Sequence, residues 1–141
     1  MEGRILLIED RADWRRRLTK YLQQEGYYYK TAGTYDEALA TLNKESFDVV
    51  LVDLRLADWD DTNFQGMELL PRINQLRKET GTQAIVVTAY PTPETVREAF
   101  HNHGVADFFM KADLDPQKLK QAIRKAVGTA SKARSEILKI E

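Results

Sequence analysis

Short runs rich in Val, Ile and Leu alternate along this chain with segments of helical periodicity, and five of each can be distinguished. Such alternation is typical of repeated βα units, in which crossover helices join parallel strands. We therefore predict one α/β domain built on a parallel sheet. The expected strands are 4–9, 27–31, 48–53, 84–88 and 107–110, and the expected helices are 12–25, 35–44, 66–79, 93–103 and 116 onward.

Several expected helix boundaries carry their own signals. Thr92 and Asp115 each precede a proline, so a side chain that can cap the helix stands before a residue suited to its first turn. Glycines follow three of the expected helices, where helices commonly end in a left-handed residue. These glycines are Gly26, Gly81 and Gly104.

Composition narrows the function classes. The 141 residues include 43% hydrophobic residues, enough for one domain with a substantial core. The formal charge of -1 predicts neither direct nucleic-acid binding nor attraction to membranes, and the lack of cysteine excludes disulfides and a cysteine nucleophile. The first apolar run is too short for a signal peptide, and no window approaches a membrane span, so we expect a cytoplasmic protein.

Polar residues that can carry chemistry follow the apolar runs. Glu9 and Asp10 end the first run, Asp53 ends the third, and Thr88 and Lys111 end the last two. Because the carboxyl ends of parallel strands lie along one edge of a sheet, we expect these five side chains to share a crevice.

The ordered combination Ile8-Glu9-Asp10, Asp53, Val87-Thr88-Ala89 and Met110-Lys111 resembles the receiver domain of bacterial two-component response regulators, of the chemotaxis-regulator type. The resemblance covers residues 4–127. It implies a flavodoxin-like, doubly wound, five-stranded parallel sheet with strand order 2-1-3-4-5. We predict a receiver domain over residues 1–127 and a C-terminal helical extension or linker over residues 128–141.

The resemblance further implies that Asp53 accepts a phosphoryl group from a sensor histidine kinase or a phosphotransfer protein. A carboxylate and a phosphoryl group are both anionic, so a divalent cation must lie between them, and oxygen ligands suit Mg2+. The resemblance assigns metal oxygens to Asp10 and Asp53, a direct or water-mediated contact to Glu9, and a backbone carbonyl ligand to Arg55.

Lys111 is expected to pair with Asp53 at rest and with a phosphoryl oxygen afterwards, while the Thr88 hydroxyl donates to another. In the family, a strand-five aromatic fills the space that the threonine vacates, and Phe108 has that position here. We expect the partner to be a downstream protein or an output domain, bound around the fourth helix, the fifth strand and the fifth helix. No enzyme activity is expected beyond the domain's own phosphotransfer and dephosphorylation.

Two other interpretations stay open. The chain could be a receiver-like interaction module that works without phosphorylation, although the intact acids, threonine and lysine argue against this. The chain could also be a phosphatase with an aspartate nucleophile. Such an enzyme usually has a second acid two residues after the nucleophile, and Arg55 at that position argues against this interpretation.

The chain departs from the family pattern at two places. Residues 54–66 form a longer loop than usual, acidic and carrying Trp59, which suggests a lid, a partner contact or attraction of cations. Ala112 stands where the family usually has a proline after the lysine. A cis peptide before a non-proline residue is costly, so we expect a trans bond between Lys111 and Ala112.

Two helical patterns allow more than one reading. The first helix carries an apolar stripe that includes Trp14, which indicates core packing, and four arginines that form either a solvated face or a docking surface for the kinase. The last helix spaces apolar residues as a weak heptad seam, which leaves a homodimer open. These arginines are Arg11, Arg15, Arg16 and Arg17, and the seam comprises Leu119, Ile123, Ala126, Ala130, Ala133, Ile137 and Ile140.

Overall fold

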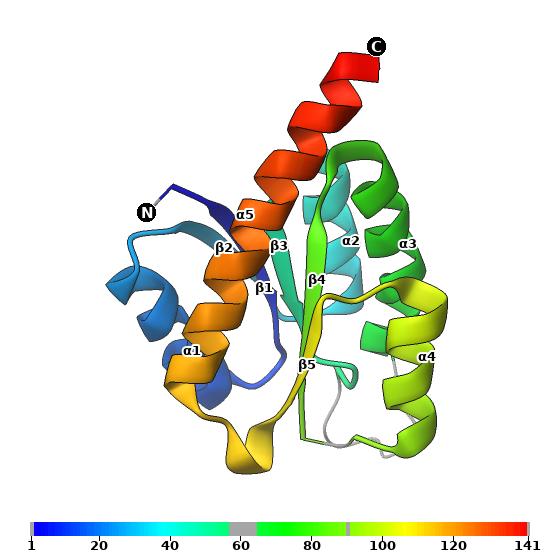
Figure 1. Cartoon of the computed structure of the whole chain (residues 1–141). Helices are drawn as coiled ribbons and strands as arrows, with labels where there is room; N and C mark the ends of the chain where they lie inside the picture. Colours follow the sequence, from blue (N-terminus) through cyan, green and yellow to red (C-terminus); the bar gives the residue numbers. More distant parts are fainter. Residues whose placement is uncertain (1, 57–64, 90, 141) are drawn as a thin grey trace.

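The computed structural model describes residues 2–56, 65–89 and 91–140. Within them, five parallel strands form one sheet with the order β2-β1-β3-β4-β5, and the chain ends in a long helix (Figure 1). The predicted fold class is confirmed. The strands are β1 (Arg4–Ile8), β2 (Tyr28–Ala32), β3 (Val49–Val52), β4 (Gln83–Thr88) and β5 (Asp107–Met110); the helices are α1 (Ala12–Gln24), α2 (Tyr35–Lys44), α3 (Gln65–Thr80), α4 (Pro93–His103), the 3-10 turn η1 (Lys111–Asp113) and α5 (Pro116–Ile140).

Alternate residues of the inner strands supply two hydrophobic layers, one on each face of the sheet. Leu6 and Val50 belong to the layer shared with α2, α3 and α4. Leu7 and Leu51 belong to the layer shared with α1 and α5. The strands β3 and β4 are buried along their whole length, as expected for parallel strands covered by helices on both faces.

The predicted helix caps are present. The Thr92 side chain accepts a hydrogen bond from the Thr95 amide, and Asp115 accepts one from the Gln117 amide at 2.9 Å. Gly26, Gly81 and Gly104 all have positive φ. The second strand begins one residue later than expected, because the Tyr27 amide donates to Leu22 in the turn that closes α1.

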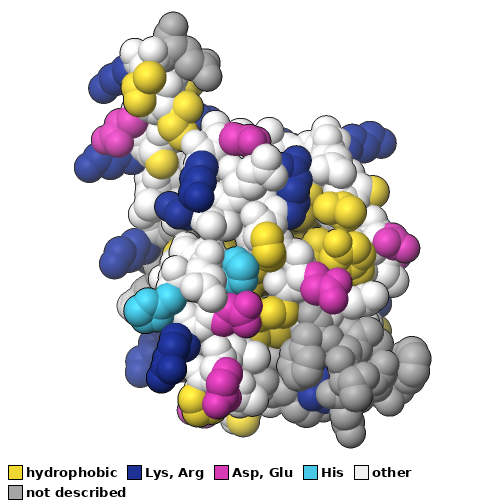
Figure 2. All heavy atoms as spheres, turned by 90° about the vertical axis from the view of Figure 1, so that its right-hand side faces the viewer, with side chains coloured by type: hydrophobic (Ala, Val, Ile, Leu, Met, Phe, Trp, Pro, Cys, Tyr) yellow, Lys and Arg dark blue, Asp and Glu magenta, His cyan; other side chains and the backbone are white. Residues whose placement is uncertain are grey.

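Helix α5 is continuous through the predicted domain boundary at residues 127 and 128. Four residues of the predicted seam are buried in the core of this domain, so their spacing is explained by intramolecular packing. The helix end projects from the body (Figure 1), and Figure 2 shows hydrophobic side chains on it; Leu138 and Ile140 are exposed. The four buried seam residues are Leu119, Ile123, Ala126 and Ala130.

Among the described helices, none combines the length and the apolar character that crossing a membrane requires.

The carboxyl ends of the strands lie at the lower edge of the sheet in Figure 1, at the opposite end of the molecule from the C-terminus of α5. This lower edge carries Glu9, Asp10, Asp53 and Lys111, which follow β1, β3 and β5, and Thr88, which is the last residue of β4.

Candidate functional site

Three carboxylates meet at this edge. Ile8 and Val52 are partners in the β1–β3 register, so the residues that follow them emerge side by side. Oxygens of Glu9, Asp10 and Asp53 all lie within 4.8 Å of one another. Glu9 and Asp53 are buried, and Asp10 is half-buried. Three acids thus share a small volume in which they repel one another unless a cation or a proton lies between them.

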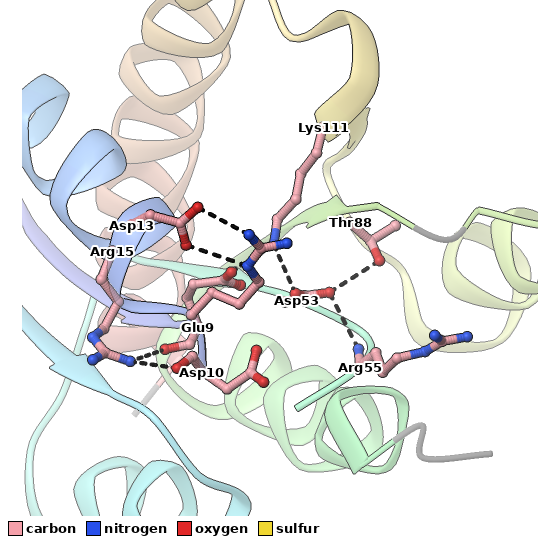
Figure 3. Close-up of polar contacts among 9 residues, drawn as sticks. Glu9, Asp10, Asp13, Arg15, Asp53, Arg55, Thr88 and Lys111 are labelled. Atoms are coloured by element: carbon pink, nitrogen blue, oxygen red, sulfur yellow. Dashed lines mark hydrogen bonds and ion pairs between the residues drawn. The ribbon is translucent and has the colours of Figure 1, made fainter. Parts of the chain in front are cut away.

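Donors from three different segments surround the Asp53 carboxylate (Figure 3). Its Oδ1 accepts hydrogen bonds from Thr88 Oγ1 at 3.0 Å and from the Arg55 amide at 3.2 Å. Its Oδ2 accepts one from Lys111 Nζ at 2.9 Å, and the same ammonium donates to Glu9 Oε1 at 2.5 Å. The structure therefore brings the acids, Thr88 and Lys111 into one buried network.

The charges in this network shift one another's protonation. Burial, together with the neighbouring Asp53, raises the pKa of Glu9 to about 9. Burial opposes the charged form of Lys111, but Asp53 and Glu9 outweigh it, so the pKa of Lys111 lies above its ordinary value. The ammonium therefore stays charged at neutral pH, while the raised pKa of Glu9 favours the neutral form of this carboxyl group.

The acidic cluster has the chemistry of a site for a hard cation. Glu9 Oε2 is buried and has no hydrogen-bond partner among the described residues. Carboxylate oxygens are the ligands that Mg2+ prefers. Figure 3 shows the Arg55 side chain directed away from Glu9 and Asp10 while its amide faces Asp53. The predicted role of the Arg55 carbonyl as a ligand stays a prediction.

Gly66 allows the start of α3 to lie directly against the backbone of Asp53. The sequence places this glycine only at the expected start of a helix. An added Cβ would lie 1.8 Å from the Asp53 carbonyl oxygen and 2.7 Å from Leu54 Cα. Only glycine lets α3 approach the backbone of the β3 end this closely. A glycine soon after a strand-end acid was the available signal, but close contact between two segments cannot be predicted from spacing alone.

Arg15 also has a role that the basic pattern of α1 did not reveal. Its Nη1 donates to the backbone carbonyl of Glu9 at 2.9 Å and to that of Asp10 at 2.8 Å (Figure 3). Gly33 leaves room for this guanidinium, since a Cβ there would lie 3.2 Å from Nη1. The interpretation as a solvated face is therefore wrong for Arg15, which anchors the turn that bears two acids.

The predicted switch residue Phe108 is half-buried and packs against the layer that α3 and α4 cover. It pairs with Val86 in the strand register, two residues before Thr88. Its ring centroid lies 6.4 Å from that of Phe100 on α4. Phe108 thus lies next to α4, on the strand that pairs with the Thr88 strand, and its switching role stays a prediction.

The second departure from the family pattern has the expected local structure. No cis peptide bond occurs in the described parts of the chain, so the bond between Lys111 and Ala112 is trans, as predicted. After β5 the chain enters η1 at Lys111. Most of the longer loop, residues 57–64, lies outside the described residues, and with it the predictions made for that segment.

The sequence profile of the response regulator receiver domain matches residues 5–124 of this chain. The chain belongs to the response regulator receiver domain family. The resemblance inferred from the strand-end residues is confirmed, and with it the general function of this receiver domain in two-component signalling.

Relatives differ in how much of their length the chain matches. The transcriptional regulatory protein GlrR of Escherichia coli is 33% identical over 133 residues, which are 94% of this chain and 28% of GlrR. The sporulation initiation phosphotransferase F of Bacillus subtilis is 26% identical over 125 residues, 89% of this chain and 94% of that protein. A CheY-like receiver domain from Methanospirillum hungatei has a TM-score of 0.80, 30% identity, and coverage of 94% of this chain and 98% of its own.

Proposed function

We propose that this receiver domain accepts a phosphoryl group on Asp53 from a sensor histidine kinase or a phosphotransfer protein. The observation that supports this most is the buried network in which Thr88 and Lys111 donate to the two oxygens of one carboxylate. Membership of the receiver family and a relative named as a phosphotransferase agree with it.

In the proposed reaction, an Asp53 oxygen attacks the phosphorus of a phosphohistidine. The new O–P bond forms as the P–N bond breaks, and the imidazole leaves with the electron pair and takes up a proton. Lys111 and Thr88, now donors to Asp53, can donate to phosphoryl oxygens instead. Catalysis then consists of positioning and of stabilising negative charge, as in other phosphoryl transfers.

We infer that Glu9, Asp10 and Asp53 hold Mg2+, with the Arg55 carbonyl as a further ligand. The buried Glu9 Oε2, which lacks a partner among the described residues, supports this donor set. A bound cation would supply positive charge between the carboxylate and the incoming phosphoryl group.

Mg2+ titration is expected to saturate, and the affinity is expected to increase from neutral pH towards pH 9. The pKa of Glu9 is raised to about 9, so below that pH a proton competes with the cation for this carboxylate. The measurement is the fluorescence of Trp14 in a Trp59→Phe background, which leaves one of the two tryptophans.

Asp10→Asn should weaken Mg2+ binding by about tenfold or more, since it removes one of three clustered charges. Asp13→Asn is the matched control, because Asp13 is an exposed acid on α1 that pairs with Arg11. Equal affinities for the two variants would remove Asp10 from the proposed site.

The partner-binding face is proposed to lie around α4, β5 and α5, and its occupant to be a downstream protein or an output domain. Phe100 and Met110 are exposed there and line a groove of about 520 Å³. Figure 2 shows hydrophobic side chains on the α3–α4 side of the molecule. A change in Phe108 would reach this groove through Phe100.

Thr88→Ala is expected to become phosphorylated but to lose most of the response on the Phe108 face. The lost hydroxyl is a donor proposed to draw β4 towards the phosphoryl group. Moving a two-state population from 1:99 to 99:1 takes about 5.5 kcal/mol of differential stabilisation. One charge-assisted hydrogen bond supplies a large fraction of this free energy, so its loss should leave most of the population in the inactive state. NMR shift mapping with a phosphoryl mimic measures the response.

Thr82→Ala is the matched control for Thr88→Ala. Thr82 is also buried and donates to the Phe47 carbonyl at 2.7 Å, but it lies before β4, at the opposite end of the strand. This variant should lose stability and keep the full response. A full response in Thr88→Ala would refute the threonine half of the switch.

Acyl-phosphate trapping with a small phosphodonor and Mg2+ separates the proposal from a phosphorylation-independent interaction module. The wild type should form a hydroxylamine-sensitive label, and Asp53→Asn should form none. An unlabelled wild type that still binds its partner would favour the module. Turnover of small phosphate esters would instead favour a phosphatase.

A further inference from the structure

Lys111 has a neighbour outside the network of Glu9, Asp53 and Thr88. Its Nζ lies 5.0 Å from the ring centroid of Trp14, a half-buried residue of α1. The distance is within the range of a cation–π contact, and the lysine side chain is only 4% exposed. The contact is therefore largely shielded from water, which strengthens the attraction between an ammonium and an aromatic ring.

Trp14 is a third neighbour of the Lys111 ammonium, beside Glu9 and Asp53. An ammonium has three N–H donors, and those of Lys111 reach two acceptors among the described residues, Glu9 and Asp53. The indole ring offers a third favourable contact without competing for a carboxylate. Trp14 lies on α1, while Glu9 and Asp53 directly follow β1 and β3, so contacts with three separate segments restrain Nζ.

The backbone at Lys111 gives a reason for such support. The residue after Lys111 is Ala112, in place of the proline usual in the family, and the chain enters η1 at the lysine itself. The turn is closed by a long hydrogen bond of 3.5 Å from the Leu114 amide to the Lys111 carbonyl. A lysine on a flexible stem then needs side-chain contacts to fix its charged end.

We propose that Trp14 is a positioning residue for Lys111, which keeps the ammonium between Glu9 and Asp53 before phosphotransfer and shields it from water. This inference rests on the proposed phosphoacceptor function of Asp53. Trp14 also packs against the hydrophobic layer between α1, α5 and the sheet, so its ring is fixed from behind. The apolar stripe on α1 thus serves both the core and the site.

Arg17 provides a matched control on the same ring. Its guanidinium carbon lies 4.5 Å from the Trp14 centroid, and its Nε donates to the Tyr21 hydroxyl at 3.1 Å. Within the described residues, Arg17 makes no hydrogen bond or ion pair with Glu9, Asp53 or Lys111. Arg17→Met removes a cation from Trp14 and leaves the ammonium contact in place.

The test compares Trp14→Leu, Trp14→Phe and Arg17→Met in the full chain with acetyl phosphate and Mg2+. Trp14→Leu should lower the maximal labelling rate about tenfold, with the apparent KM for acetyl phosphate unchanged, as expected for a desolvated cation–π contact. Trp14→Phe keeps an aromatic face and should stay within about threefold of the wild type. Arg17→Met should label at the wild-type rate.

A second readout does not require phosphorylation. The Lys111 ammonium protons should exchange slowly with water in NMR spectra of the wild type and rapidly in Trp14→Leu. Should Trp14→Leu fail to fold, Trp14→Met, which keeps more side-chain volume, takes its place in both measurements. Wild-type labelling and wild-type exchange in the non-aromatic variant would overturn the inference. A wild type that takes no label would refute the phosphoacceptor function, while proton exchange would still decide the role of Trp14.

Discussion

Gly66→Ala is expected to lower the free energy of unfolding by about 3 kcal/mol or more and to abolish labelling of Asp53. Its Cβ would lie 1.8 Å from the Asp53 carbonyl oxygen, closer than any real contact allows. Relief requires movement of the start of α3 or of the β3 end, because the atoms met are backbone atoms. Overpacking of this kind is costly, and here it also displaces the nucleophile.

Gly128→Ala is the matched control. Gly128 lies within α5, and a Cβ there meets no atom within 4 Å. Alanine should therefore raise the free energy of unfolding by about 0.5–1 kcal/mol through helix propensity alone. Chemical denaturation measures both variants. A Gly66→Ala protein as stable and as readily labelled as the wild type would show that α3 does not support Asp53 as described.

Lys111→Met is expected to reduce labelling about hundredfold and, without Mg2+, to lower the free energy of unfolding by about 2–4 kcal/mol. The substitution leaves two buried carboxylates, Glu9 and Asp53, without their shared ammonium. The raised pKa of Glu9 limits the loss, because this group can retain its proton. Saturating Mg2+ should restore part of the stability, since a cation again balances the acids.

Lys132→Met serves as its control, since Lys132 is exposed on α5. It should change the free energy of unfolding by no more than about 0.5 kcal/mol and leave labelling intact. If Lys111→Met proves as stable and as reactive as Lys132→Met, the ammonium neither balances the acids nor assists the transfer.

The fold could be predicted because its signals are local. Apolar runs, caps such as Thr92 and the glycines after helices each depend on a few neighbouring residues. The convergence of Asp53 and Lys111 could also be anticipated, because parallel strands end at one edge whatever the details of packing. The last helix was harder, since the spacing of Leu119 and Ile123 suits a seam between chains as well as a core stripe.

The support of the site could not be predicted in the same way. The contact between Gly66 and the Asp53 backbone, the bonds from Arg15 to two carbonyls, and the placement of Trp14 over Lys111 all join segments whose distance depends on side-chain packing. Each of these residues has an ordinary local explanation in the sequence, as a helix start, a basic face or an apolar stripe.

Asp53 is proposed to take the phosphoryl group, and peptide mapping of the trapped product identifies the residue that carries it. The chain is labelled with acetyl phosphate and Mg2+, reduced with borohydride to convert aspartyl phosphate to homoserine, digested and analysed by mass spectrometry. We expect conversion at Asp53 and none in Asp53→Asn. Conversion at Asp10 or another acid, or an equal yield from Asp53→Asn, would contradict it.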